Sequence, residues 1–227
     1  MQSLPAIMAS YEALAQSAAR PVQTAASTDP LGVQGVPLGF DRNEEIFGEG
    51  EPAGCVYRVL QGVVRTHRIL SDGRRQITDF YLPGDVFGLQ DGEGYSTSAE
   101  AVTPCQVLAM RRTVLTGKAA RDPVAAQKLW NLALHRLRRS EEHMMVLGRK
   151  GANERVAWFL LDMSERIPAP DRVELPMSRQ DMADFLGLTI ETVSRTMTVL
   201  QEDELIGLPS YRNVTLIDRR ALLDLAA

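Results

Sequence analysis

The sequence contains few cysteines and no long apolar run. Only two cysteines, Cys55 and Cys105, occur among 227 residues, which is too few for a disulfide scaffold. They also lack the close spacing and the neighbouring histidines of a metal site, so we expect two small, largely buried side chains. The sequence has no run of 18 or more apolar residues, the pattern that predicts a membrane-spanning helix. No secretory signal is recognisable either. These absences favour a cytoplasmic protein.

The chain also lacks the net positive charge that commonly accompanies nucleic-acid binding. Its net charge is −4, and the charge is unevenly distributed. Residues 111–150 carry 10 Lys and Arg against 3 Asp and Glu, whereas residues 151–227 carry 8 against 13. Any DNA-binding role of the C-terminal segment must therefore rest on a structural motif and a few placed side chains, because a basic surface is absent there.

Residues 36–121 contain short apolar or β-branched runs that are separated by glycines. Asp72-Gly73 predicts a hairpin turn, because glycine adopts a positive φ without steric cost. Many short strands at this spacing predict a β-roll (jelly roll). Residues 1–35 are rich in Ala, Ser, Gln and Pro, and we expect a flexible leader there. The expected strands are Ile46–Phe47, Cys55–Leu60, Val63–Val64, Ile77–Tyr81, Val86–Phe87 and Cys105–Met110.

Residues 122–149 predict a long helix for dimerisation. Asp122 can cap the free N–H groups and Pro123 suits the first helical position, while Gly148 is the expected stop. A coiled-coil-like stripe along this helix packs either on the chain's own β-roll or on a partner helix. A neighbouring apolar stripe offers a second face, which favours a homodimer. The second stripe is Leu129, Trp130 and Leu134, and the expected dimer-interface residues are Ala133, Leu137, Ser140, Met144 and Leu147.

Residues 177–200 predict a helix-turn-helix inside a C-terminal domain that spans 150–227. Ser178 is a good N-cap, and Asp181 three residues later completes a capping-box-like pair. Gly187 lies at the turn, where a positive φ is required. Thr189 is the expected cap of the second helix.

The spacing of small and branched residues strengthens this interpretation. Ala183 must be small where the second helix crosses the first, and Val193 points back into the angle between them. An ordinary helix pair with a glycine cap is the alternative, but this spacing together with two caps favours DNA binding. Two strands, Ile206–Pro209 and Val214–Ile217, are expected to form a wing.

The outward face of the second helix, near its N-terminus, is the part of such a motif that meets base edges in the major groove. Arginine can grip guanine with two hydrogen bonds, glutamate can accept one from cytosine, and serine can bond to several bases. A Glu–Arg pair four residues apart can also be a solvated ion pair; within this turn we favour base readout. The expected base contacts are Ile190, Glu191, Ser194 and Arg195, and the expected phosphate contacts are Ser178, Arg179, Thr189 and Arg212.

A β-roll, a long helix and a winged helix-turn-helix, in this order, resemble the CRP/FNR family of transcription regulators. The resemblance covers residues 36–227 and is strongest in Leu82–Gly88, Glu154–Ala157 and Ser178–Arg195. Leu188-Thr189-Ile190-Glu191 is most similar to the FixK branch. The resemblance implies an α+β fold with a cyclic-nucleotide-binding-like β-roll. It also implies a homodimeric activator that reads a TTGA-N6-TCAA-type palindrome and contacts RNA polymerase. Thr196 departs from the FNR pattern, in which an apolar residue is usual.

The sensory features of the family are missing from this sequence. Residues 1–54 contain no cysteine, which argues against the FNR iron–sulfur cluster. Where the cyclic-nucleotide branch has a Gly-Glu pair and an Arg-Ser pair, this chain has Gly88-Leu89 and Ser96–Ala99. A buried phosphate would lack its cationic partner. We therefore expect no cofactor and no small-molecule effector, with a ligand- or redox-gated regulator that senses through the β-roll as the alternative.

Three further expectations concern other chemistry. His67, His135 and His143 are haem-ligand candidates in principle, but lone histidines are more often structural. No nucleophile–base pair, metal spacing or phosphate loop supports an enzyme. Leu225-Ala226-Ala227 is a small apolar tail of the type that bacterial proteases recognise, so a cytosolic protease is an expected partner. A frayed helix end is the alternative.

Overall fold

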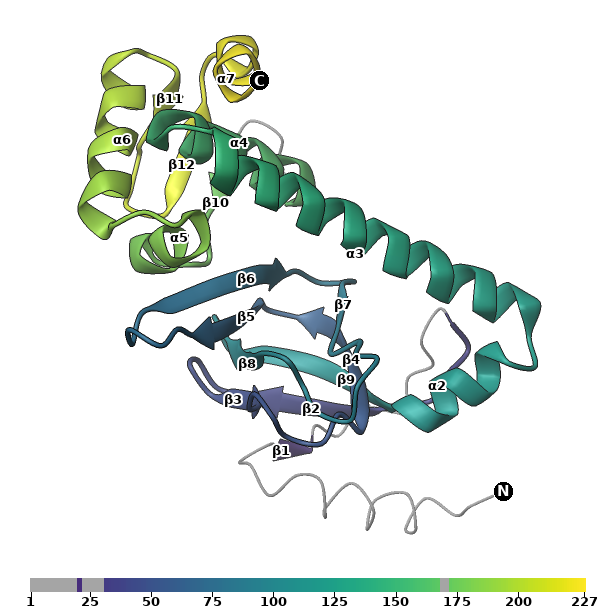
Figure 1. The fold of residues 1–227 in the computed structure, drawn as a ribbon. Helices are drawn as coiled ribbons and strands as arrows, with labels where there is room; N and C mark the ends of the chain where they lie inside the picture. The colour runs from purple at the N-terminus through teal and green to yellow at the C-terminus, as the bar shows by residue number, and fades with distance from the viewer. Residues whose placement is uncertain (1–19, 22–30, 168–171) are drawn as a thin grey trace. The chain divides into compact units, whose positions relative to one another are not determined.

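The structure, a computed structural model, describes residues 20–21, 31–167 and 172–227 (Figure 1). These residues form two units: 20–21, 31–68 and 79–129 make the first, and Ile69–Thr78 with Trp130–Ala227 make the second. Most of the predicted leader, 1–35, lies outside the described residues. Among the described helices, none combines the length and the apolar character that a membrane crossing requires.

The predicted β-roll is confirmed as two antiparallel sheets (Figure 1). One sheet has the order β1-β2-β9-β4-β7, and the other has the order β3-β8-β5-β6. The strands are β1 (Arg20–Pro21), β2 (Val36–Phe40), β3 (Glu45–Phe47), β4 (Cys55–Gln61), β5 (Val64–Ile69), β6 (Arg75–Tyr81), β7 (Val86–Phe87), β8 (Ser98–Ala101) and β9 (Cys105–Arg111).

Three of these strands were not anticipated from the sequence: β1, which lies within the predicted leader, and β2 and β8. The strand β2 contains Pro37 and Gly39, which are both depleted in strands, and β8 is built from the small and polar residues Ser-Ala-Glu-Ala. Both pair in register with a stronger neighbour, β2 with β9 and β8 with β5. Pairing between distant segments therefore overrides a weak local preference.

Aromatic rings fill the interior of the β-roll. Alternate strand residues point inward, and the rings of Phe47 and Tyr95 stack with their centroids 3.7 Å apart. Phe87 lies 5.2 Å from the Tyr57 ring and 5.2 Å from the Tyr81 ring. The Tyr95 hydroxyl donates to the Cys55 carbonyl at 2.8 Å, so the polar end of this buried ring is satisfied.

A short helix, α2 (Arg112–Ala119), precedes the long helix α3 (Pro123–Arg149). The predicted cap is confirmed, since Asp122 Oδ1 accepts from the N–H groups of Val124 and Ala125. The predicted stop at Gly148 is wrong. The helix continues through it, and Lys150 still donates its backbone N–H to the Val146 carbonyl at 3.3 Å. Glycine ends a helix when it turns left-handed, and Gly148 is not among the glycines with a positive φ.

The C-terminal elements form the predicted winged helix-turn-helix. A three-stranded sheet with the order β10-β12-β11 is the wing, and α4 packs against both α6 and α7. The elements are α4 (Ala152–Arg166), β10 (Arg172–Glu174), α5 (Arg179–Leu186), α6 (Ile190–Glu202), β11 (Ile206–Gly207), β12 (Asn213–Leu216) and α7 (Arg219–Ala226).

Thr196, the departure from the FNR pattern, is accommodated by a local polar pair. Thr196 is only 4% exposed, and its hydroxyl donates to Asn153 Oδ1 at 3.2 Å. A buried hydroxyl without a partner would cost free energy. Asn153 at the start of α4 removes that cost, so the packing between α4 and α6 is maintained.

Candidate nucleic-acid interface

The first helix of the motif, α5, begins with a complete capping box. The Ser178 hydroxyl accepts from the Asp181 N–H at 3.1 Å. In return, Asp181 Oδ2 accepts from the Ser178 N–H at 3.0 Å and from its hydroxyl at 2.8 Å. Two N–H groups that a helix start leaves without intrahelical partners are thereby satisfied, and the start of α5 is defined to the residue.

The turn between the helices depends on Gly187. Its φ of 62° and ψ of 39° are left-handed, a conformation that glycine adopts at low cost. An added Cβ would lie 3.4 Å from Leu147 Cδ2 and 3.5 Å from Arg155 Nη1, which are ordinary contacts. The backbone conformation, and not a lack of space, is therefore the reason for glycine at this position.

Arg155 holds this turn in a way that the sequence reasoning missed. Its Nη1 donates to the Leu186 carbonyl at 2.9 Å, its Nη2 to the Leu147 carbonyl at 2.9 Å, and its Nε to the Lys150 carbonyl at 2.8 Å. The guanidinium thus joins the end of α3 to the end of α5. Arg155 lies in the motif Glu154–Ala157, but its role could not be assigned because its acceptors are backbone carbonyls.

The second helix, α6, separates a buried face from an exposed face. Val193, Met197 and Leu200 are at most 2% exposed, and the Thr189 hydroxyl caps the helix by accepting from the Thr192 N–H at 3.2 Å. The four predicted base-contact residues lie near the helix start: Glu191, Ser194 and Arg195 are exposed, and Ile190 is half-buried.

The Glu191 carboxylate carries a full charge at neutral pH. Hydrogen bonds from its own backbone N–H and from the Thr189 hydroxyl lower the pKa of Glu191 below its usual value. Both bonds belong to the first turn of α6, where the helix dipole also favours negative charge. An ionised Glu191 is an acceptor only, which suits it to an amino group such as cytosine N4.

The four predicted phosphate-contact residues differ in exposure. Thr189 is exposed, and Ser178 and Arg212 are half-buried. Arg179 lies differently from the expectation, because it is 6% exposed. Its Nη2 donates to the Tyr211 carbonyl at 3.2 Å, and its guanidinium lies 5.2 Å from the centre of the Tyr211 ring. Burial lowers the pKa of Arg179. In this arrangement its guanidinium binds the wing instead of facing solvent.

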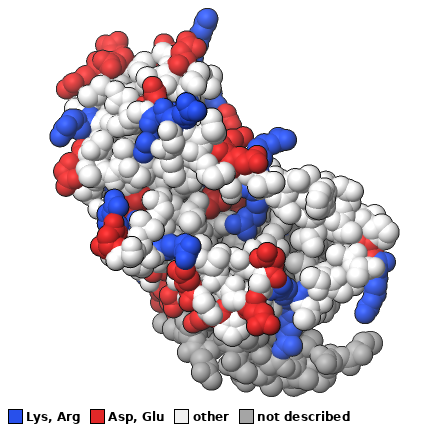
Figure 2. All heavy atoms as spheres, viewed as in Figure 1, with Lys and Arg blue, Asp and Glu red and all other residues white. Residues whose placement is uncertain are grey.

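The charged side chains on the surface are of mixed sign, as the net charge of −4 leads one to expect. On the face shown in Figure 2, basic and acidic side chains are interspersed, and no broad basic area is visible. Several basic side chains of the second unit are paired with carboxylates, as in Arg139–Asp162 at 2.8 Å and Arg219–Glu165 at 3.1 Å. On this face, the basic area that usually marks a DNA-binding surface is absent.

The predicted dimer stripe on α3 is accessible in the single chain. Ala133, Leu137, Ser140 and Met144 are exposed, and Leu147 is half-buried. The large apolar residues Trp130, Leu137 and Met144 are 61%, 55% and 63% exposed, and they recur every seven residues. A helix of a soluble protein seldom leaves such a row uncovered.

His143 lies off this stripe and faces inward. Its Nε2 lies 2.9 Å from the Phe185 carbonyl oxygen, and its ring stacks on Phe185 at 4.0 Å. This histidine therefore has a structural role at the end of α5. Among the described residues, no group of three or more His, Cys, Asp or Glu side chains is arranged to hold a metal ion.

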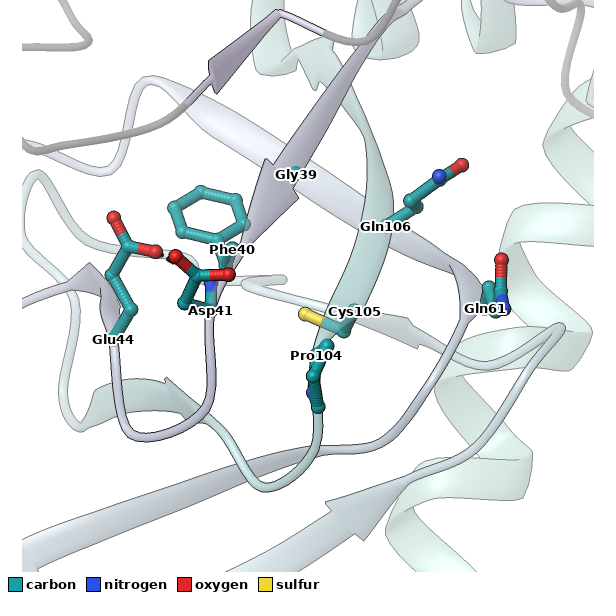
Figure 3. Close-up of a pocket in the computed structure, with 8 residues that line it drawn as sticks. All are labelled: Gly39, Phe40, Asp41, Glu44, Gln61, Pro104, Cys105 and Gln106. Atoms are coloured by element: carbon teal, nitrogen blue, oxygen red, sulfur yellow. Dashed lines mark hydrogen bonds between the residues drawn. The ribbon is translucent and has the colours of Figure 1, made fainter.

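A small cavity in the β-roll lies next to Cys105 (Figure 3). Its volume is about 270 Å³. Burial raises the pKa of Cys105 to about 12, so its thiol is protonated at neutral pH. No Lys or Arg is among its described lining residues, which are Gly39, Phe40, Asp41, Glu44, Gln61, Pro104, Cys105 and Gln106. A cavity with two carboxyl groups does not suit a phosphate.

Comparisons with known proteins agree with this architecture. Residues 37–122 match the cyclic nucleotide-binding domain and residues 154–225 match the Crp-like helix-turn-helix domain. The nitrogen fixation regulation protein FixK of Azorhizobium caulinodans is 50% identical over 92% of this chain and 84% of its own length. FixK of Rhizobium meliloti is 42% identical over 82% and 85%. The structure of FixK2 from Bradyrhizobium japonicum has 45% identity and a TM-score of 0.82, and the match covers 85% of this chain and 98% of that one.

Proposed function

The chain belongs to the CRP/FNR family of transcription regulators and is of the FixK type, a family of DNA-binding proteins and not of enzymes; from this premise we propose that it is a homodimeric activator that reads a TTGA-N6-TCAA-type palindrome and contacts RNA polymerase. The observation that carries the readout is the exposed face of α6. Glu191, Ser194 and Arg195 share it, and capped ends and a buried opposite face hold the helix in place.

The roles of these side chains follow from their donors and acceptors. Arg195 would donate two hydrogen bonds to guanine O6 and N7, Glu191 would accept from cytosine N4, and Ser194 would bond to a neighbouring base. Ile190 would contact a thymine methyl group. Ser178, Thr189 and Arg212 would set the register on the phosphates. A phosphate contact by Arg179 would first require its guanidinium to leave Tyr211.

The readout is tested with single-residue variants and labelled duplexes. Arg195→Ala should abolish specific binding and Glu191→Ala should relax it, with a loss of about 1–3 kcal/mol for a bidentate contact, or roughly 5- to 150-fold in affinity. Both residues are exposed, so thermal unfolding should change little. Equal binding of wild type and both variants to a TTGA-N6-TCAA duplex would show that the assignment is wrong.

Dimerisation through α3 is supported by the exposed row of Trp130, Leu137 and Met144. Pairing of two such helices would remove these side chains from water, and a two-fold dimer matches a palindromic site. Leu137→Glu with Met144→Glu should give a monomer in light scattering and abolish binding to the full palindrome. A dimer that persists at micromolar concentration would place the interface elsewhere.

Activity without an effector is supported by the filled interior of the β-roll. Gly88 and Ser96–Ala99 correspond to the ligand-binding stretches of the cyclic-nucleotide branch. Aromatic rings lie beside Gly88: a Cβ built there would be 3.5 Å from Tyr95 Cε1 and 3.2 Å from Tyr57 Cδ2. The match to a cyclic nucleotide-binding domain keeps a ligand-gated regulator as the second candidate. Native mass spectrometry and absorption spectra of the purified protein distinguish the two, because a bound small molecule, haem or iron would support gating.

A cytosolic protease is a further proposed partner, through Leu225, Ala226 and Ala227. In the structure Lys150 Nζ donates to the carbonyl oxygens of Ala226 and Ala227, the latter at 2.9 Å. Recognition would require release of the tail from Lys150. Replacing Ala226-Ala227 with Asp-Asp should lengthen the half-life of the protein in cells, and an unchanged half-life would remove the idea.

A further inference from the structure

Arg75, at the start of β6, makes two ion pairs with the first helix of the DNA-binding motif. Its Nε donates to Asp184 Oδ2 at 2.8 Å, and its Nη2 donates to Asp181 Oδ1 at 2.7 Å. Next to it, Gln76 Nε2 donates to the Phe185 carbonyl at 3.3 Å. Residues Ile69–Thr78 group with the C-terminal residues in one unit, so these contacts belong to the same body as α5 and α6.

The two carboxylates are well shielded and use their other oxygens on α5 itself. The side chains of Asp181 and Asp184 are 6% and 12% exposed. Asp181 Oδ2 completes the capping box with Ser178, and Asp184 Oδ1 accepts from Gln180 Nε2 at 2.6 Å. Residues three apart share one face of a helix, so without a cation between them the two charges would repel each other in a poorly solvated place.

Arg75 is suited to the space between these carboxylates. Burial of its guanidinium opposes the charged form, but hydrogen bonds and charge from Asp184 and Asp181 outweigh it and raise the pKa of Arg75. The planar fork of arginine can serve two carboxylates at once, which a lysine ammonium does less well.

Arg75 and its carboxylate partner Asp184 lie close to the start of α6, the end of the motif that is proposed to read DNA bases. Arg75 and Asp184 line one hollow of about 780 Å³ together with Thr189 and Glu191 at the start of α6. Residues 151–227 have a net charge of −5. Two uncompensated carboxylates at this position would therefore both loosen α5 and repel DNA phosphates.

We propose that Arg75 is a positioning residue for DNA binding, which holds α5 in place and neutralises Asp181 and Asp184 without itself touching DNA. The inference rests on the proposed function and extends it to a residue more than 100 positions from the recognition helix. Because Arg75 acts through the carboxylates, its loss should be partly reversed by removing one of them.

The test compares adjacent arginines. Arg74 is exposed and pairs with Asp72 at 2.8 Å, so Arg74→Gln removes the same charge beside the same site. With a TTGA-N6-TCAA duplex, Arg75→Gln should weaken binding roughly tenfold, and Arg74→Gln less than about twofold. Arg75→Lys should lie between wild type and Arg75→Gln. Equal effects of the two Gln variants would overturn the proposal.

Two more measurements separate positioning from direct contact. Arg75→Gln with Asp184→Asn should bind more tightly than Arg75→Gln alone, whereas additive losses would overturn the coupling. The dependence of affinity on salt should keep its slope in Arg75→Gln, because a drop of about one in the slope would mean that Arg75 contacts a phosphate.

Hydrogen exchange keeps the inference distinct from the proposed target site. Amides of α5 should exchange faster in Arg75→Gln than in Arg74→Gln, with no DNA present. If α5 exchanges faster in Arg75→Gln but the wild-type protein does not bind the TTGA-N6-TCAA duplex, the proposed target sequence is wrong and the positioning role is still supported. If α5 exchanges equally in the two variants, the positioning role fails.

Discussion

The two helices of the helix-turn-helix carry similar charged residues and use them in opposite ways. In α5, Asp181 and Arg179 are buried, and their charged atoms bind neighbouring parts of the chain. In α6, Glu191 and Arg195 are exposed. The difference shows how an acidic domain can bind DNA. Charges that would hinder binding are paired inside the motif, and a few side chains are left facing outward.

Asp181 and Glu191 give the sharpest test of this comparison, because each is a carboxylate near a helix start. Asp181→Ala removes both the capping box and one of the two carboxylate partners of Arg75, so the free energy of unfolding should fall by roughly 3 kcal/mol. Glu191→Ala should change it far less, because this carboxylate is exposed, and should mainly alter base preference. Urea unfolding of the two variants and of wild type measures this, and an equal loss of stability in both would break the comparison.

Arg179 and Arg195 form the corresponding pair of arginines. Arg179→Ala should lower stability by roughly 2 kcal/mol, because it removes a buried guanidinium, its bond to the Tyr211 carbonyl and its contact with the ring. Arg195→Ala should leave the melting temperature unchanged and abolish specific binding. Should Arg179→Ala keep full stability and instead reduce the salt dependence of binding, Arg179 would be a phosphate contact.

The two N-caps are where the helices should behave alike. Ser178→Ala and Thr189→Ala each remove a side-chain acceptor at a helix start, and each should cost about 1 kcal/mol in unfolding free energy. Replacement by Asp or Asn should retain most of that stability in both helices. Thermal unfolding of these variants measures the effect. If removing the cap destabilises the protein in only one of the two helices, the two caps are not equivalent and the expectation is wrong.

The smallest effect is expected on the buried face of α6. Thr196→Val keeps the shape but removes the hydrogen bond to Asn153, and the gain in apolar packing should hold the loss to about 0.5 kcal/mol. Binding of the palindrome should not change, because Thr196 faces away from the base-contact residues. Altered base preference in this variant would mean that the two faces of α6 are not independent.

Stability at high pH offers a check on the β-roll. Burial raises the pKa of the Cys105 thiol from its usual value near 9 to about 12, so the unfolded chain loses this proton first. The stabilising contribution is present below pH 9 and should be lost as the pH rises towards 12. The free energy of unfolding of Cys105→Ala should therefore fall less steeply between pH 9 and pH 12 than that of wild type. Alkylation of Cys105 in the folded protein should be slow at pH 8.

Much of the fold was predictable because its signals are local. Glycine and proline punctuation indicated six of the β-roll strands and the Asp72-Gly73 hairpin, in which Gly73 has a φ of 83°. The caps at Asp122, Ser178 and Thr189 were predictable because an N-cap involves only the next two or three residues. By contrast, β1, β2 and β8 were missed, because each depends on pairing with a strand elsewhere in the sequence.

The sequence by itself determined the helix-turn-helix, its caps and the outward face with Glu191, Ser194 and Arg195, because helical periodicity places these residues without reference to the rest of the chain. Only the tertiary structure decided how the remaining charges are used. Arg75 meets Asp181 and Asp184 across more than 100 residues, Arg155 binds backbone carbonyls at the ends of two helices, and Arg179 turns to the wing. No local pattern predicts such contacts, since they depend on which distant groups packing brings within hydrogen-bonding distance.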